Sequence, residues 1–324
     1  MAKGTIKMDN PPPPPVIQAP GKSVKYKGVK HTILVMSGKG GVGKSTIAVN
    51  LAVTLSDLGF RVGLVDADIN GPDDPKLLGV ENEKVYADEK GIVPVETKYG
   101  PRVISMAFLL PSQDTAVIWR GALRHKAVQQ FLEDVIWDNM DYVILDFPPG
   151  TGDEALTVAQ LIPDSDGAVI VITPQDLAIL DAVKAINFAG QLKMKVLGLI
   201  ENMSGFVCPH CGEKTDLFKS GTIGKVAEKY GVELLGSLPF VPDVVLNADN
   251  GVPAVRSSKD IQDTFIEIAK KITDWISLCF HEEGVSLLAC HGHPCKEGVG
   301  QIARPLMVLA GYLTRLLQQS LLAS

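Results

Sequence analysis

The chain has 324 residues, of which 46% are hydrophobic, a formal net charge of −6 and a pI of about 5.6. This length and apolar content suffice for a large α/β core, and the acidic balance argues against a general nucleic-acid binder. The start of the chain does not resemble a signal peptide, and no window reaches the roughly 18 apolar residues of a membrane span. Five cysteines are too few for a disulfide framework. We therefore expect a cytoplasmic protein without a transmembrane segment.

In chain order, the sequence divides into three predicted parts. Residues 1–30 carry the proline run Pro11–Pro15 and indicate a flexible arm. Residues 31–276 alternate strand-like and helix-like runs, which predicts a single doubly wound α/β domain with a mostly parallel sheet. Residues 277–324 form a tail. The predicted strands are 33–36, 62–65, 103–106, 142–145, 168–172, 196–200 and 234–237. The predicted helices are 44–57, 122–136, 153–161, 176–191, 222–230 and 259–276.

A glycine-rich loop lies between the first predicted strand and the first predicted helix. It fits the P-loop pattern G-x-x-x-x-G-K-[ST] in full. Its backbone N–H groups and the helix N-terminus suit phosphate oxygens, so the loop predicts an ATP site. Lys44 should reach the β- and γ-phosphates, and the Ser45 hydroxyl should ligate Mg²⁺. The predicted nucleotide-binding residues of the loop are Gly38, Lys39, Gly40, Gly41, Val42, Gly43, Lys44, Ser45 and Thr46.

Acidic residues follow two later strands at the edge where an open α/β sheet binds its ligand. Asp66 and Asp68 follow the apolar run at 62–65, and Asp146 follows the apolar strand predicted at 142–145. We assign Asp146 and Asp66 to the Mg²⁺ shell and Asp68 to the orientation of the attacking water. The alternative is that the first pair only caps a turn. The Pro-Pro-Gly-Thr-Gly stretch at 148–152 would stiffen the loop near the γ-phosphate.

Two further motifs follow the strand predicted at 196–200. Asn202, in the run Glu201–Ser204, has an amide able to read an adenine edge. Cys208 and Cys211 form a C-x-x-C pair, which supplies half of a metal site. A second copy of the chain could add its own pair around a [4Fe–4S] cluster, or the tail could complete a zinc site. The pair could also be a redox dithiol.

These motifs together resemble the Mrp/ApbC family of iron–sulfur cluster carriers, a branch of the MinD/ParA-like ATPases. The resemblance covers roughly residues 28–276. It is carried by the following segments: Gly38–Thr46, Asp66–Asp68 with Gly71-Pro72, Asp146–Asp153, Thr173–Asp176, Glu201–Ser204 and Cys208–Cys211.

The resemblance implies an ATP-hydrolysing homodimer that holds a labile [4Fe–4S] cluster on Cys208 and Cys211 and transfers it to apo iron–sulfur proteins. It also implies that Lys39 reaches the nucleotide of the partner subunit. The catalytic set would then be Lys39, Lys44 and Asp68. The sequence departs from the family pattern at Asn70 and at Asp73-Asp74, and the small N-terminal domain of many members is missing.

The tail lies outside this resemblance. It brings Cys290, His291, His293 and Cys295 into six residues, a density that allows a metal site but matches no common zinc template. A leucine-rich stretch beyond Pro305 predicts a helix packed on the body or on a dimer partner, or a membrane-surface helix.

The sequence therefore predicts an ATP-dependent iron–sulfur cluster carrier. A positioning or partitioning ATPase of the MinD/ParA type is one alternative, although it would not need paired thiolates. An ATP-driven metal-insertion chaperone is another, because it too would need ATP and thiolates.

Overall fold

The computed structural model describes residue 26 and residues 28–69, 71–89, 91–109, 128–162, 164–208, 211–215 and 222–282. The chain separates into two units, residues 1–278 and residues 279–324. All that follows concerns the first unit. The predicted arm and tail, with Cys290, His291, His293 and Cys295, lie almost wholly outside the described residues, and so does Asn70.

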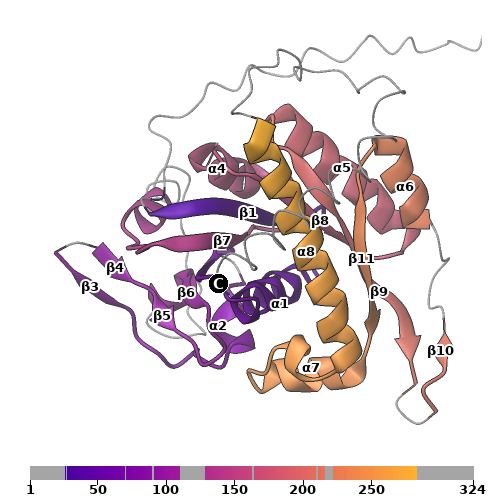
Figure 1. Ribbon diagram of the computed structural model, residues 1–324, viewed down its shortest axis with the longest axis horizontal. Helices are drawn as coiled ribbons and strands as arrows, with labels where there is room; N and C mark the ends of the chain where they lie inside the picture. Colours follow the sequence, from indigo (N-terminus) through magenta and orange to yellow (C-terminus); the bar gives the residue numbers. More distant parts are fainter. Residues whose placement is uncertain are drawn as a thin grey trace, which may run out of the picture. The chain divides into compact units, whose positions relative to one another are not determined.

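A single large sheet forms the centre of the described part of the chain (Figure 1). The strand order is β10-β9-β8-β1-β7-β2-β6-β5, and β11 pairs with β9. All of these pairs are parallel except β10 with β9 and β5 with β6. The strands are β1 Val29–Ser37, β2 Val62–Asp66, β5 Val95–Glu96, β6 Arg102–Ser105, β7 Met140–Asp146, β8 Gly167–Ile172, β9 Val196–Val207, β10 Lys214–Thr215 and β11 Leu234–Phe240. A separate hairpin pairs β3 Tyr86–Asp88 with β4 Gly91–Val93.

Helices cover both faces of the sheet, as a doubly wound fold requires. One apolar cluster joins α1 and α8 to the strands, and two others join α4, α5 and α6 to the opposite face. The central strands are buried on both faces, and every residue of β8 is buried. The helices are α1 Lys44–Asp57, α2 Asp74–Leu77, α4 Asp153–Leu161, α5 Asp176–Gln191, α6 Thr222–Tyr230, α7 Pro242–Asp249 and α8 Lys259–Glu282. Short 3-10 turns occupy Met106–Leu109 and Ala254–Arg256, and residues 128–133 are also helical. The predicted fold class is therefore confirmed.

Several predicted boundaries differ from the structure by a few residues, and the helix predicted to end at 276 runs to residue 282. In two other segments the prediction was wrong because a neighbouring strand pairs with the chain there. The helix predicted over 122–136 ends at residue 133, and residues 122–127 lie outside the described residues. Beyond it, the Ile92 N–H donates to the Asp134 carbonyl (2.7 Å), and the Ile136 N–H donates to the Ile92 carbonyl (2.9 Å). The strand predicted to end at 200 runs to Val207, because β11 stays paired with it from Leu199 to Phe206.

The register of the central strands sets the position of the acidic residues. β2 pairs with β7 so that Asp66 lies opposite Asp146, and Asp146 lies opposite Val35 of β1. The same register places Ser105 of β6 opposite Asp66. The carboxyl ends of four adjacent strands therefore meet just below the glycine-rich loop.

Candidate functional site

The glycine-rich loop connects β1 directly to α1. Gly41 and Gly43 have positive φ angles of 76° and 82°, a conformation that a side chain would strain. The Ile47 N–H donates to the Gly43 carbonyl at 3.0 Å, which starts the 14-residue helix α1. No side chain caps this helix N-terminus. Its positive end therefore faces the loop without a protein carboxylate in the capping position.

The loop forms one wall of a cavity of about 400 Å³. Lys39, Lys44 and Ser45 line it, together with Asp68 after β2 and Pro149 after β7. The opposite rim comes from α2 and α7, where Lys76 Nζ lies 3.5 Å from Asp249 Oδ1. Apart from Gly38 and Val42, the predicted P-loop residues thus face a common space of ligand size with the predicted water-orienting acid.

Lys44 lies almost completely buried at the floor of this cavity. Its Nζ donates to both Asp146 carboxylate oxygens at 2.7 Å, and the two side chains are 6% and 1% exposed. Burial is the largest single influence and would lower the pKa of Lys44, but the charge and hydrogen bonds of Asp146, together with the charges of Asp74 and Asp66, raise the pKa above its ordinary value. Lys44 Nζ also lies 3.4 Å from Ser45 Oγ. The lysine, the serine and the strand-end acid therefore form one polar group.

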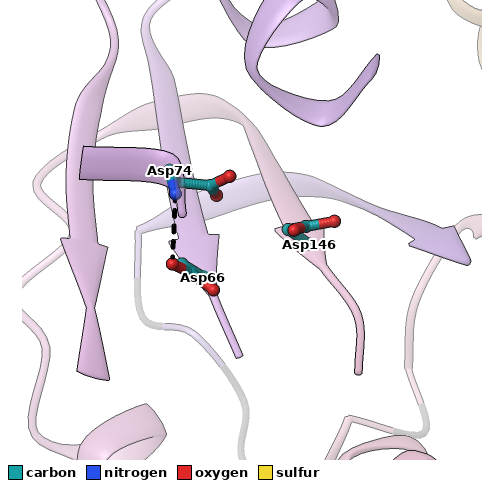
Figure 2. Close-up of side chains that lie close together, drawn as sticks. All are labelled: Asp66, Asp74 and Asp146. Atoms are coloured by element: carbon teal, nitrogen blue, oxygen red, sulfur yellow. Dashed lines mark hydrogen bonds between the residues drawn. The ribbon is translucent and has the colours of Figure 1, made fainter. Parts of the chain in front are cut away.

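Three carboxylates meet beside this lysine. Asp66 from the end of β2, Asp74 from the start of α2 and Asp146 from the end of β7 each place one oxygen within 4.8 Å of the others (Figure 2). Ser105 Oγ donates to Asp66 Oδ2 at 2.8 Å, and the Asp74 N–H reaches the same oxygen at 3.4 Å. Complete burial is the main cause that raises the pKa of Asp66 and of Asp74 well above the ordinary value, and repulsion from the other acids adds to it. Burial also raises the pKa of Asp146, since one lysine only partly offsets it.

Asp68, Lys39 and Asn202 surround the loop more loosely. Asp68 is 9% exposed, lines the cavity and accepts a hydrogen bond from the Gly71 N–H at 3.2 Å. Lys39 Nζ donates to Gln175 Oε1 at 3.2 Å in an exposed position. Asn202 lies inside β9 rather than after it, and its Nδ2 donates to the Val42 carbonyl at 2.9 Å. The asparagine therefore ties the sheet to the loop.

The paired cysteines lie on a hairpin where β9 ends. The Cys208 N–H donates to the Glu213 carbonyl (3.0 Å), and the Gly212 N–H donates to the Cys208 carbonyl (2.8 Å). Gly212 has a φ of 72°, which lets the chain reverse, and β10 then pairs antiparallel with the end of β9. Cys208 is partly exposed and Cys211 is exposed. A turn closed by two backbone hydrogen bonds therefore carries the thiols near the surface.

The structure gathers the nucleotide-site residues but keeps the cysteines apart from them. Neither cysteine lines the cavity. Asp66, Asp74 and Asp146 form what we call the acid cluster. Within the described ranges, it is the only group of three or more potential metal-ligating side chains that lie close together. Cys208 and Cys211 belong to no such group in the described part of this one chain.

The sequence did not predict two residues at this site, Asp74 of the acid cluster and Ser105, which donates to it. Ser105 ends β6, and only the register of that strand reveals its bond to Asp66. Asp74 stood out only as a departure from the family pattern. An acid in a segment rich in Gly, Pro and Asp normally indicates a solvated turn, yet Asp74 is completely buried.

The family follows from the comparison with known proteins. A family model described as ParA: NUBPL iron-transfer P-loop NTPase matches residues 28–273. The chain belongs to this family. The resemblance predicted from the motifs is thereby confirmed.

Known members and structures agree with the NUBPL-type assignment. An iron-sulfur cluster carrier protein of Methanocaldococcus jannaschii is 48% identical over 246 residues, which cover 76% of this chain and 85% of that protein. A solved nucleotide-binding protein from Archaeoglobus fulgidus, in complex with ADP and with cobalt, is 43% identical with a TM-score of 0.62 and covers 69% of this chain and 87% of that one. MinD of Aquifex aeolicus has a TM-score of 0.55 at 22% identity over 81% of this chain and 100% of that one, which bears on the fold alone. In the described residues, no helix is both long and apolar enough to cross a membrane.

Proposed function

We propose that this chain is an ATP-dependent carrier of iron–sulfur clusters, which receives a [4Fe–4S] cluster as cargo and transfers it to apoproteins. The observation that carries the proposal is an exposed C-x-x-C hairpin on the same domain as a P-loop cavity. The name of the 48% identical relative, an iron-sulfur cluster carrier protein, supports the same function. A positioning ATPase shares the fold but would have no use for the thiol pair.

In this proposal the cavity binds Mg²⁺–ATP. Gly38 to Thr46 wrap the phosphates with backbone N–H groups, and Lys44 leaves Asp146 to contact the β- and γ-phosphates. Oxygen ligands suit Mg²⁺, and the chain offers the Ser45 hydroxyl and the carboxylates of Asp66 and Asp146 in one polar cluster. When bound, the metal ion would neutralise charge on the β- and γ-phosphate oxygens.

Hydrolysis needs a positioned water and a compensating charge. Asp68 lines the cavity beside the acid cluster, and we assign it to orienting the attacking water. Lys39 extends along the exposed rim to Gln175, away from the buried cluster. That outward position suits contact with the nucleotide of a second protomer. Asn202 would contact the adenine only after leaving the Val42 carbonyl, so its proposed role implies a rearrangement when ATP binds.

The hairpin would bind the cluster between two protomers. A [4Fe–4S] cluster takes four thiolates, and each chain supplies Cys208 and Cys211. Two chains that meet at this hairpin would together supply all four, which is why we propose a homodimeric bridge. Thiols near the surface would hold the cluster in reach of an acceptor. The proposed ATPase domain spans residues 31–276, between an N-terminal arm and a C-terminal tail, in a cytoplasmic protein.

Anaerobic reconstitution with iron and sulfide tests this function. We expect the absorption of a [4Fe–4S] cluster, one cluster per two chains, and activation of an apo-ferredoxin-type acceptor. Cys208→Ala and Cys211→Ala should bind ATP normally but hold no cluster, whereas Cys279→Ala, the matched thiol control, should hold it. A monomer that retains a complete cluster would refute the bridging arrangement, and a full cluster in both hairpin variants would refute the assigned ligands.

A further inference from the structure

Asp74 differs from its neighbours in the acid cluster because its carboxylate has no hydrogen-bond partner among the described residues. Asp66 accepts hydrogen bonds from the Ser105 hydroxyl and from the backbone N–H groups of Asp68 and Asp74. Asp146 is paired with Lys44. Both carboxylate oxygens of Asp74 are buried and have no hydrogen-bond partner among the described residues. A buried carboxylate normally has such partners, since leaving it without them is costly. This side chain therefore requires an explanation that the protein atoms do not supply.

The position of Asp74 is fixed by its surroundings. Its own N–H donates to Asp66 Oδ2, which ties the start of α2 to the end of β2. The next turn is held by the Val80 N–H, which donates to the Pro75 carbonyl at 2.8 Å, and Leu78 is completely buried. The preceding residue, Asp73, is exposed. Packing of α2 thus holds the Asp74 carboxylate inside the cluster instead of letting it turn to solvent.

The cluster has more negative than positive charge. Three carboxylates and one lysine leave two net negative charges when all four groups are ionised. A divalent cation has the charge that balances this excess. Nucleotide-bound Mg²⁺ usually takes only one or two protein carboxylates, because the phosphates supply the other charged oxygens. A third carboxylate would supply some of the charged oxygen ligands that the phosphates otherwise provide.

We propose that Asp74 is a third carboxylate of the cation site, with Asp66 and Asp146, and that this set binds a divalent metal ion before any nucleotide arrives. The inference rests on the Mg²⁺ site of the proposed function and extends it from a site completed by ATP to one that the chain completes itself. Carboxylate number sets the affinity of an oxygen site for divalent ions. Loss of Asp74 should therefore weaken the metal without removing the P-loop.

Manganese is a direct probe, because electron paramagnetic resonance counts free Mn²⁺ in solution. The full chain is stripped of metal, cluster and nucleotide and titrated with Mn²⁺. We expect one Mn²⁺ per chain, displaced by Mg²⁺, and at least about tenfold weaker binding in Asp74→Asn. Glu83→Gln removes one negative charge from an exposed position outside the cavity, and it should change the affinity by no more than about twofold.

Thermal unfolding supplies a second readout that does not depend on activity. Mn²⁺ should raise the Tm of the wild type more than that of Asp74→Asn, because the ion stabilises the state that binds it. If Asp74→Asn does not fold, Asp74→Ser takes its place in the same titration. Equal Mn²⁺ affinity in wild type and variant would overturn the inference, and so would wild-type binding that needs nucleotide.

The two proposals fail in different ways. A chain that loses Mn²⁺ with Asp74→Asn, yet binds neither ATP nor a cluster, would refute the proposed function and leave the cation site in place. A chain that binds ATP and a cluster, with Mn²⁺ affinity unchanged by the substitution, would refute the role of Asp74 alone. Fluorescent ATP binding and cluster absorption, recorded on the same preparations, distinguish these results.

Discussion

The cavity under the glycine-rich loop and the cysteine hairpin differ in how much of each one chain completes. The cavity is lined by residues at and after the ends of the adjacent strands β1, β7 and β2 and by α2 and α7, and its buried lysine is bonded to both oxygens of Asp146. The hairpin projects beyond the end of β9 and is closed by two backbone hydrogen bonds. Its cysteines are partly or fully exposed, and among the described residues they belong to no cluster of three potential metal ligands.

This difference matches two kinds of chemistry. A phosphate and metal site needs fixed dipoles and charges in a dry environment, which a sheet edge and a helix N-terminus supply. A site that gives its cargo away must remain accessible and easily opened. Changes in the cavity should therefore affect nucleotide chemistry, and changes in the hairpin should affect the cluster. The following experiments test that separation, in order of decreasing effect.

Loss of Lys44 should have the largest effect. Lys44→Ala removes a charged donor to the phosphates, and each such bond contributes about 1.5–3 kcal/mol, so we expect ATP affinity to fall by about 100-fold. Equilibrium binding of a fluorescent ATP analogue measures this. Cluster content after reconstitution should stay at the wild-type level, because the hairpin lies outside the cavity. A parallel loss of cluster would break the separation of the two regions.

Lys39→Ala is the matched control in the same loop. Lys39 contacts Gln175 at the exposed rim and makes no bond to the buried acids. Its removal should spare ATP binding and lower the hydrolysis rate, if it acts on the nucleotide of the partner subunit. Equal losses of ATP affinity in both lysine variants would argue against that role.

Asp68→Asn tests the water-orienting carboxylate. The variant keeps the size of the side chain and the acceptor for the Gly71 N–H, so ATP should bind within about twofold of wild type. Hydrolysis should slow by about 100-fold, the low end of what a positioned acid or base contributes. Single-turnover release of phosphate measures the rate. A wild-type rate would exclude Asp68 from this step.

The sequence was sufficient for the features that depend on local pattern. The glycine-rich loop with Lys44 follows one apolar strand, and Asp66 and Asp146 each stand at the end of another. Their common location is therefore predictable from the parallel sheet alone. Asp74 was not predictable, because its burial depends on how α2 packs against the end of β2. The place of Asn202 inside β9 depends on pairing with β11, about 36 residues later in the chain.

Two glycines with the same backbone conformation allow a direct comparison of the regions. At Gly43 an added Cβ would lie 2.2 Å from Asn202 Nδ2, and φ is +82°. Gly43→Ala should therefore lower ATP affinity by about tenfold or more and cost about 1–2 kcal/mol of folding stability, because the positive φ strains alanine and the Asn202 side chain must move away from the new methyl group. The hairpin should keep its cluster in this variant.

Gly212 has a φ of +72°, but an added Cβ there meets nothing within 4 Å. Gly212→Ala should cost about 1 kcal/mol of local strain in the cysteine turn. A chelator should then remove the cluster about fivefold faster, since about 1 kcal/mol corresponds to roughly that factor in rate. ATP hydrolysis should not change. Faster hydrolysis or weaker ATP binding in Gly212→Ala would show that the two regions are coupled already in one chain.

Substitution of Asp141 should have the smallest effect. It tests whether losses are specific to the sites, because Asp141 lies near the start of the strand that Asp146 ends. Hydrogen bonds from Lys30 and then Arg61 hold the pKa of Asp141 well below its ordinary value. A lowered pKa stabilises the fold above the unfolded value near 4, and this stability is lost as the pH falls through the folded pKa. The Asp141 side chain is 17% exposed and its Lys30 partner 64%, so solvent limits the contribution.

We therefore expect Asp141→Asn to lower the free energy of unfolding by about 1 kcal/mol at pH 7 and by clearly less at pH 3. Urea unfolding at the two pH values measures the difference. ATP affinity and cluster content should both remain at the wild-type level, because Asp141 lies at the opposite end of β7 from the cavity. If this remote change reduced either activity, the losses seen with cavity variants would reflect general instability. Unchanged activities would instead assign those losses to the sites themselves.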